Sequence, residues 1–402
     1  MIRPSPSRRR AVTTCVCSLA FLTIVDRVSI SAAKTEISAE LGISDALFGW
    51  VFGAFTVGYT LLMMPSGWLA DRVGPRKTLA LCVLAWSVLT ALTGWVYGTL
   101  ALLAVRFLFG LTQAGAFPGA ARAIANWLPV EERGLAMGLL NTGSRLGAAF
   151  GLWGVSVSVV RFGWRESFWG LAAAGVVWAA FWFWWFRDRP PGEILKTAAP
   201  SGAAEVNLLR MPSAYLLPFQ YFASQVTFFL CFTWLLPYLR TRFRLSAGDA
   251  GFYAAIPLYV GAMANWVSGN VVDRLYRVGR GIWSRKLPAI CGFALASAAL
   301  PLAAAMEAPG GFILFFAIAT FGVDLTLSPS WTACADIGGK HTGTLSGAMN
   351  MMGSVGGLVS SVLFPVLFTA TGGIWVYFSL AIVLNLAGAV AWWLALREPK
   401  KL

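Results

Sequence analysis

GWLADRVGPRK, residues 67–77, joins two long apolar segments and is almost the only dense polar stretch in the first 120 residues. Gly67, Gly74 and Pro75 favour helix ends. The stretch also carries a charged hinge, made of Asp71, Arg72, Arg76 and Lys77. A weaker copy, GNVVDRLYR at residues 269–277, repeats Gly67, Asp71 and Arg72 at an offset of 202 residues as Gly269, Asp273 and Arg274. A charged loop repeated at half the length of an apolar chain predicts two related helical bundles.

The composition is that of a membrane protein. The chain has 402 residues, of which 58% are hydrophobic and 12% are charged, whereas soluble domains have about 25% charged residues. Its mean hydropathy is +0.70. Apolar runs of about 18 or more residues are long enough to cross a bilayer. The predicted spans are 11–33, 46–66, 78–97, 100–125, 134–159, 166–186, 214–237, 248–269, 287–306, 310–332, 342–368 and 374–396. The predicted fold is all-α, with 12 transmembrane helices in two pseudo-symmetric six-helix bundles.

The chain is predicted to divide at a polar, Pro- and Gly-rich linker, residues 187–213. The bundles are then 1–186 and 214–402. The N-terminus is similar to the start of a signal peptide, but Asp26-Arg27 follows the apolar run instead of a small-residue cleavage site, so the first segment is predicted to be a span. With these spans, 22 Lys and Arg residues lie on the side of the N-terminus and 6 on the other side. The positive-inside rule therefore predicts that both termini are cytoplasmic.

A second repeat supports two related halves. RGLAMGLLNTGSRLG begins at Arg133, and TGTLSGAMNMMGSVG begins at Thr342. At an offset of 209 residues, Gly134, Gly138, Asn141 and Gly147 match Gly343, Gly347, Asn350 and Gly356. Glycines four residues apart let membrane helices approach closely, so these segments are predicted to be packing helices of the two halves.

Several other classes are disfavoured. The six cysteines lie in or beside apolar segments and the chain has one histidine, so zinc sites and disulfides are not expected. The net charge of +14 is spread over short loops, which argues against a nucleic-acid partner. The sequence has no H-E-x-x-H, G-x-S-x-G or P-loop pattern, so an enzyme or an ATP-driven pump is not expected. No cofactor and no metal are predicted.

The charged hinge resembles the loop between helices 2 and 3 of the major facilitator superfamily. Four further segments resemble its anion:cation symporter branch: DRVSISAA (26–33), GWVFGAFTVGYTLLMMPSGWLADR (49–72), RFLFGLTQAGAFPGAARAIANWLP (106–129) and SPSWTACADI (328–337). That branch includes bacterial sugar-acid and phthalate permeases and the vesicular glutamate and sialic acid transporters. The resemblance implies a secondary transporter that moves a sugar acid or other small carboxylate by rocker-switch alternating access. It also implies a monomer in the bilayer of a bacterial inner membrane, with protons as a further expected partner.

Five charged residues fall inside the predicted helices: Asp26, Arg27, Arg106, Arg145 and Asp324. A charge at mid-membrane costs about 2.5–3.5 kcal/mol on insertion scales, so such residues usually serve a function or have a partner. Three arginines against two aspartates leave a surplus of one positive charge. Because arginine binds carboxylates bidentately, this surplus indicates a small anion as substrate.

The resemblance assigns roles to some of these residues. Arg27 and Arg106 match arginines that the family places around its substrate anion, and Tyr59 matches a cavity position. The alternatives are that both arginines anchor the helices at the membrane edge and that Tyr59 faces lipid. Gln113 stands where many sugar-acid symporters have a glutamate tied to proton coupling. Since glutamine does not titrate, Asp26 and Asp324 are the candidates for proton coupling, and an uncoupled uniporter or exchanger is the alternative.

Other predicted site residues are polar or aromatic. Arg145 is either a third anion contact or the partner of Asp26 or Asp324. The resemblance places Asn141, Trp331 and Asn350 around the substrate, with helix–helix hydrogen bonding as the alternative for the two asparagines and packing for Trp331. Gln220 is a further candidate, because it begins a polar stripe at i, i+4 and i+7. Six charged residues are expected to form a cytoplasmic latch, as in the family: Asp71, Arg72, Arg76, Lys77, Asp273 and Arg274.

Two other function classes compete with anion uptake. A receptor could bind the same anion without moving it, although only a few residues follow the last predicted span. A multidrug exporter would share the fold, but a surplus of buried arginine disfavours cationic drugs. The sequence predicts neither the substrate nor the direction of transport.

Overall fold

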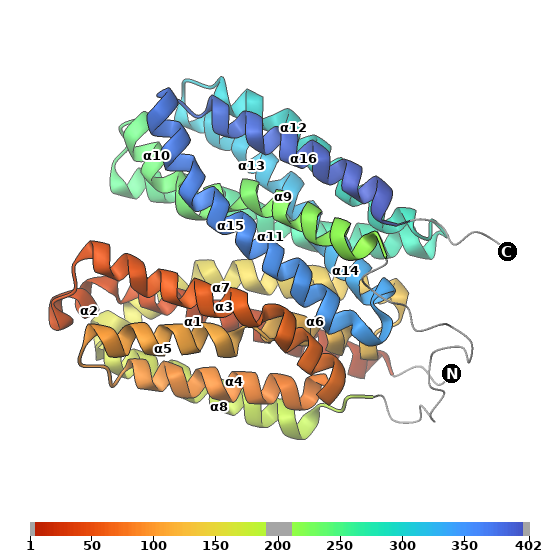
Figure 1. The fold of residues 1–402 in the computed structure, drawn as a ribbon, viewed down its shortest axis with the longest axis horizontal. Coiled ribbons are helices and arrows are strands. Elements are labelled where there is room, and N and C mark those ends of the chain that lie inside the picture. Colours follow the sequence, from red (N-terminus) through yellow and green to blue (C-terminus); the bar gives the residue numbers. More distant parts are fainter. Residues whose placement is uncertain (1–4, 190–210, 397–402) are drawn as a thin grey trace. The chain divides into compact units, whose positions relative to one another are not determined.

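The computed structural model describes residues 5–189 and 211–396, and these residues are almost entirely helical (Figure 1). The helices of the first part are α1 (Pro6–Ala32), α2 (Lys34–Leu41), α3 (Asp45–Val73), α4 (Pro75–Thr93), α5 (Thr99–Gln113), α6 (Ala116–Trp127), η1 (Val130–Glu132), α7 (Arg133–Phe162) and α8 (Trp164–Trp185). Those of the second part are α9 (Ser213–Thr233), α10 (Leu235–Arg242), α11 (Ala247–Arg277), α12 (Trp283–Ala304), α13 (Pro309–Leu325), α14 (Leu327–Ile337), η3 (Gly339–His341), α15 (Thr342–Thr371) and α16 (Trp375–Ala395).

Each of the twelve predicted spans falls on one or two of these helices, which agrees with the predicted fold class. In the described residues, nine helical segments are long and apolar enough to cross a membrane, and α9 with α10, bent by 47°, makes a tenth. The more polar helices α7 and α11 lie outside that set, but their 30 and 31 residues span about 45 Å, more than the roughly 30 Å of a hydrocarbon core. Helix α2 was not predicted, because its eight residues are too short for a span.

Two further spans are broken helices, and a proline explains each break. Pro118 has no N–H to donate to the Ala114 carbonyl, where α5 ends and α6 begins. Pro329 likewise cannot bond the Leu325 carbonyl between α13 and α14. That carbonyl instead accepts a hydrogen bond of 2.6 Å from the Ser268 hydroxyl, so the broken backbone is satisfied inside the protein.

The described chain forms two compact units. Among the described residues, unit 1 contains 5–127, 143–189 and 338–348, and unit 2 contains 128–142, 211–337 and 349–396. Helices α7 and α15 therefore each contribute one part to each unit. Most of the predicted linker, residues 190–210, lies outside the described residues, and the division into bundles 1–186 and 214–402 stays a prediction.

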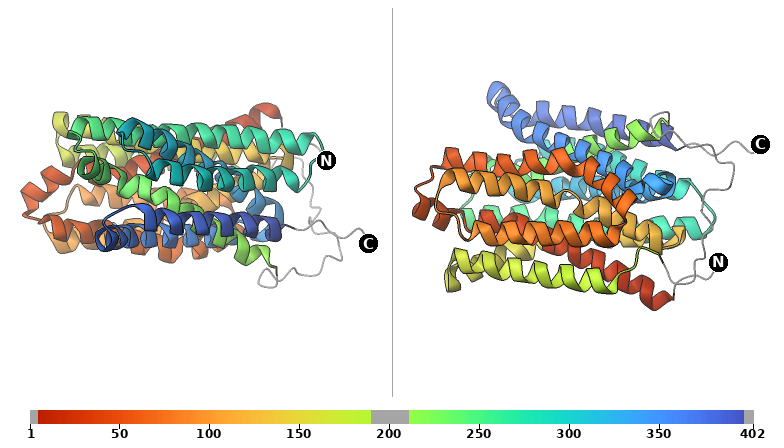
Figure 2. Two further views of the ribbon diagram at one scale, coloured as in Figure 1. Left: turned by 90° about the horizontal axis from the view of Figure 1, so that it is seen from above. Right: turned by 60° about the horizontal axis from the view of Figure 1, so that its bottom comes forward.

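In unit 1, α3 packs along α5 and α4 packs along α8. Within each unit, the long helices run along a common direction (Figure 2). A buried apolar cluster joins α1, α3, α5 and α8, with Ile30, Phe48, Leu102 and Phe168 at its centre. Because lipid tails are as apolar as these side chains, close packing between the helices, and not exclusion from water, stabilises this cluster.

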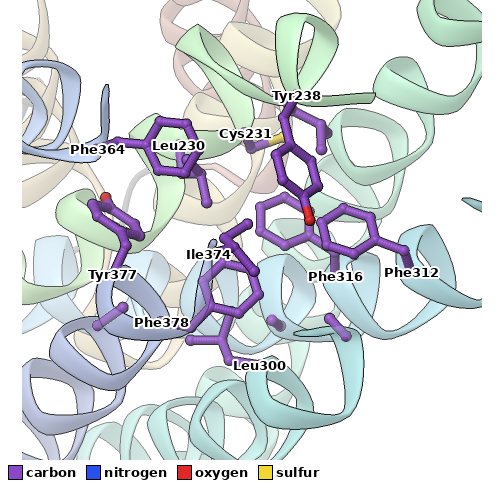
Figure 3. Packing of buried hydrophobic residues seen from close by; sticks show 14 of the residues in the cluster. Leu230, Cys231, Tyr238, Leu300, Phe312, Phe316, Phe364, Ile374, Tyr377 and Phe378 are labelled. Carbon is purple, nitrogen blue, oxygen red and sulfur yellow. The ribbon is translucent and has the colours of Figure 1, made fainter. Parts of the chain in front are cut away.

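The core of unit 2 is aromatic (Figure 3). Phe312 and Phe316 of α13 stack on Phe378 of α16, with ring centroids 6.5 and 6.1 Å from that ring. Tyr377, also on α16, donates its hydroxyl to the Val226 carbonyl at 2.8 Å. The core thus ties α9, α13 and α16 together and holds the polar side chains of α9 in fixed positions.

The repeated glycines are points of close helix approach. A Cβ on Gly67 of α3 would overlap the Gly343 carbonyl oxygen of α15, both in unit 1. In unit 2 the repeat-related pair does the same, because a Cβ on Gly269 of α11 would lie 2.7 Å from the Gly134 carbonyl oxygen of α7. The two sequence repeats therefore meet each other, and each unit contains an equivalent glycine contact.

Candidate anion-binding site

Arg27 of α1 and Gln113 at the end of α5 form the polar centre of unit 1. The Arg27 Nε and Nη2 donate to Gln113 Oε1 at 3.2 and 3.1 Å. Gln113 is fully buried, and its Nε2 donates to the Thr23 carbonyl at 3.0 Å. Arg27 therefore holds a neutral amide where a glutamate would have neutralised its charge.

Aromatic rings surround both arginines of this site. The Arg27 Cζ lies 4.3 Å from the centroid of Tyr59 and 4.9 Å from that of Phe55. The Arg106 Cζ lies 5.2 Å from the same Phe55 centroid and 4.7 Å from that of Phe109. Such contacts stabilise a desolvated guanidinium by about 2 kcal/mol or more each. Phe55 thus contacts both cations. The sequence did not single it out, although its position one turn before Tyr59 could have indicated that it faces the same site.

Arg106 and Asp26 are buried with unsatisfied polar atoms. Arg106 is 2% exposed and Asp26 is 1% exposed. Among the described residues, Arg106 Nε and Asp26 Oδ1 have no hydrogen-bond partner, while Asp26 Oδ2 accepts from Trp86 Nε1 at 2.9 Å. Trp86 of α4 is a second contact that sequence reasoning missed. The Arg106 charge acts electrostatically on Asp26. This one carboxylate therefore balances the charge of only one of the two arginines.

The burial of Arg106 and Tyr59 bears on the alternatives that Arg106 anchors its helix at the membrane edge and that Tyr59 faces lipid. Arg106 and Tyr59 are 2% and 5% exposed, so neither side chain extends into lipid in this structure. Arg27 is partly exposed, which leaves its guanidinium accessible. Unit 1 therefore brings together Asp26, Arg27, Tyr59, Arg106 and Gln113 from three helices.

The other predicted substrate residues are distributed over both units. Arg145 of α7 belongs to unit 1 and is partly exposed. Asn141, one turn earlier, belongs to unit 2, and its Nδ2 donates to the Met137 carbonyl of the same helix at 2.8 Å. Asp324 is buried in unit 2 on α13, and Asn350 is partly exposed on α15.

Gln220 and Trp331 make hydrogen bonds within unit 2. Gln220 Nε2 donates to the Leu217 carbonyl at 2.9 Å and to Ser330 Oγ at 3.0 Å, and its Oε1 accepts from Trp392 Nε1 at 3.0 Å. The Trp331 Nε1 donates to the Tyr221 hydroxyl at 3.3 Å. Both side chains therefore make hydrogen bonds between helices of this unit.

The predicted latch residues lie at helix ends, and two of them cap another helix. In unit 1, Asp71 Oδ1 and Oδ2 accept from the backbone N–H groups of Gly343 and Thr344, both at 2.7 Å. In unit 2, Asp273 Oδ1 and Oδ2 accept from the N–H groups of Gly134 and Leu135, both at 2.8 Å. Each carboxylate thus binds free donors at the positive end of a helix, α15 or α7.

The remaining charges of the hinge make different contacts. Arg76 Nε donates to the Phe183 carbonyl of α8 at 2.7 Å. The Arg72 guanidinium lies 5.1 Å from the ring centroid of Trp68 in its own helix, and Lys77 and Arg274 are exposed. The sequence analysis missed Arg122, whose Nε lies 3.7 Å from Asp71 Oδ1.

The family model described as Major Facilitator Superfamily matches residues 16–361. A probable sulfoacetate transporter of Cupriavidus necator is 32% identical over 401 residues, covering 95% of this chain and 93% of that protein. A D-galactonate transporter of Escherichia coli is 30% identical over 386 residues, covering 88% of each. Among solved structures, the human organic anion transporter MFSD10 superposes with a TM-score of 0.73 at 16% identity, covering 96% of this chain and 100% of that one. The Escherichia coli proton:xylose symporter XylE gives 0.77 at 13% identity, covering 96% and 95%.

These matches confirm the resemblance that the charged hinge indicated. The curated relatives are named transporters, which also confirms that this protein is a transporter and not an enzyme. The match to the family model extends over most of the chain, and the 32% identical relative covers nearly all of it. This chain therefore belongs to the Major Facilitator Superfamily.

Proposed function

We propose that this protein is a secondary active transporter that moves a small organic anion across the membrane by alternating access. The observation that carries the proposal is the pair Arg27 and Arg106, held against one ring of Phe55. Arg106 is buried with an unpaired Nε, and the single carboxylate of Asp26 leaves one of the two arginine charges uncompensated, which is costly. An anion bound at this pair supplies the missing partner. The sulfoacetate and D-galactonate transporters among its relatives are consistent with such a substrate.

Asp26 is the proposed proton carrier, because Gln113 does not titrate. One Asp26 oxygen has no partner, and the other is held by Trp86. Bound substrate adds negative charge near this carboxylate and so favours its protonated form. By linkage, protonation of Asp26 strengthens substrate binding to the same extent. Asp324 is a second candidate for this role in unit 2, and a uniporter or exchanger is the alternative that the neutral Gln113 favours.

The latch is proposed to act at the helix ends bound by Asp71 and Asp273. Carboxylates that cap α15 and α7 stabilise one of two conformations and so bias a two-state equilibrium. Arg72, Arg76, Lys77 and Arg274 complete the charged hinges. The proposed arrangement is a monomer with two bundles, 1–186 and 214–402, in a bacterial inner membrane with both termini in the cytoplasm.

Transport by purified protein in liposomes tests this proposal. We expect uptake of labelled sulfoacetate or D-galactonate, faster with an inward proton gradient than without one. Arg106→Gln removes the buried charge and should abolish uptake, whereas Arg242→Gln, at an exposed position of α10, should not. Binding without uptake would identify a receptor. Equal uptake with and without the gradient would identify a uniporter or exchanger.

A further inference from the structure

We infer that the substrate is a compact dianion, with two acid groups on a short spacer and few or no hydroxyl groups, which excludes the polyhydroxylated sugar acids from the broader carboxylate class that the family resemblance implies. The inference rests on the proposed function and narrows the substrate class of the same site. It follows from the charges around Phe55, from their separation and from the hydrogen bonds already made within unit 1.

The charge of the site favours two negative groups. Arg27 and Arg106 are both cationic, and the side chain bonded to Arg27 is the neutral Gln113. Asp26 is the carboxylate that acts on Arg106, so the group carries a net charge of +1 with Asp26 ionised and +2 with Asp26 protonated. A proton on Asp26 and a dianion on the two arginines leave the group neutral. A monoanion would neutralise the group with Asp26 ionised, but with Asp26 protonated, the state proposed for coupled transport, it leaves one buried positive charge uncompensated, which is costly.

The separation of the two cations favours a short spacer. Because the guanidinium carbons lie 4.9 and 5.2 Å from the same Phe55 centroid, they are at most about 10 Å apart. Each guanidinium holds an acid oxygen at about 2.8 Å. Two acid groups separated by on the order of one to three carbon atoms fit between them, and both can be bound at once.

The surroundings disfavour a polyhydroxylated chain. The walls beside the arginines are the rings of Phe55, Tyr59 and Phe109. The Gln113 amide bonds Arg27 and the Thr23 carbonyl, and the Thr23 hydroxyl bonds Leu19 of its own helix at 2.7 Å. Hydroxyl groups against these rings would lose their water without gaining partners, which costs about 1–3 kcal/mol each.

The amide of this group, Gln113, is thus already committed within unit 1. A site that recognises a sugar acid needs such groups free for the substrate, since discrimination by hydroxyl groups depends on unpaired partners in the site. Methylene groups of a short spacer, in contrast, pack well against aromatic rings.

Affinity measurements on the full-length protein in detergent test the inference. Thermal shift and calorimetry would compare four probes at constant ionic strength: sulfoacetate as a short dianion, its methyl ester as the matched monoanion, D-galactonate as a hydroxylated monoanion and galactarate as a hydroxylated dianion. We expect sulfoacetate to bind at least about tenfold tighter than each of the other three. Tighter binding of either hydroxylated probe would overturn the inference while leaving anion transport intact. No binding of any probe would overturn the proposed function as well.

Two variants separate the effect of the Arg27 charge on binding from any effect on folding. Arg27→Gln should reduce the preference for sulfoacetate over its methyl ester by about tenfold or more, whereas Arg27→Lys, which keeps the charge, should retain a clear preference. An unchanged preference in a folded Arg27→Gln protein would contradict the two-arginine account. The thermal unfolding of each variant without probe shows that it is folded.

Discussion

Asp71 and Asp273, 202 residues apart in the sequence, perform the same structural task in different units. Each accepts hydrogen bonds from two successive backbone N–H groups at the start of a helix, Asp71 from α15 and Asp273 from α7. Their donors Gly343 and Gly134 are themselves related by the second repeat of 209 residues. The same capping contact therefore occurs in both repeated halves of the chain and is not confined to one loop.

Asp71→Asn should reduce transport while sparing substrate binding. An amide oxygen replaces one carboxylate oxygen, but the amide NH₂ cannot accept the second backbone N–H, and the charge that favours the helix N-terminus is lost. We expect a loss of about 1–2 kcal/mol from this cap. Uptake into liposomes and affinity by calorimetry measure the two properties separately. Glu307→Gln, at an exposed loop position, is the control, and normal uptake by Asp71→Asn would refute the latch.

The sequence predicted the helices well because membrane spans leave a strong composition signal, and the breaks at Pro118 and Pro329 follow from local chemistry. It pointed to Arg27 and Arg106 as candidate site residues for a similar reason, since charged residues in apolar helices are conspicuous. It did not reveal Phe55 or Trp86, because an aromatic residue in an apolar helix looks like any other packing residue. Nor could it tell that Gln220 bonds three neighbours, since those contacts come from residues up to 172 positions away.

Gly67→Ala should destabilise the protein by about 1–3 kcal/mol. Its new methyl group would overlap the Gly343 carbonyl oxygen, which belongs to a helix backbone and cannot move aside freely. Gly154→Ala is the matched control, because a Cβ there meets nothing within 4 Å and alanine favours the helix. Thermal unfolding in detergent should show a lower Tm for Gly67→Ala and an unchanged or higher Tm for Gly154→Ala. Equal effects would mean that α3 and α15 do not approach as described.

Glu40 should make stability depend on pH. Hydrogen bonds from Arg165 and then Trp164 lower the pKa of its carboxyl below the usual 4.5. Since the folded state binds this proton more weakly, the contribution to stability is present above the unfolded pKa and is lost as the pH falls through the folded one. The carboxylate is 47% exposed, so the effect is small. Between pH 7 and pH 3, the wild type should lose slightly more in Tm than Glu40→Gln. Identical losses would show that the pair contributes nothing.

Gln113→Glu should weaken substrate binding at neutral pH. The new carboxylate would form an ion pair with Arg27, whose Nε and Nη2 already point at this side chain. A bound anion must then compete with a fixed internal anion, and we expect about a tenfold loss of affinity. Lowering the pH should restore binding, because the protonated glutamate resembles the native amide. Affinity measured from pH 5 to pH 8 tests this, and an unchanged profile would mean that Arg27 does not meet the substrate.

Asp26→Asn should uncouple transport from protons. Asparagine keeps the shape of the side chain and can still accept the hydrogen bond from Trp86 Nε1, but it does not titrate. We therefore expect anion exchange to persist while the acceleration by an inward proton gradient disappears. Counterflow with equal pH on both sides measures exchange, and uptake driven by the gradient measures coupling. Asp324→Asn is the parallel variant for unit 2. If it alone abolished the gradient effect, the proton carrier would be Asp324 and the unpaired oxygen of Asp26 would serve only to balance the charge of Arg106.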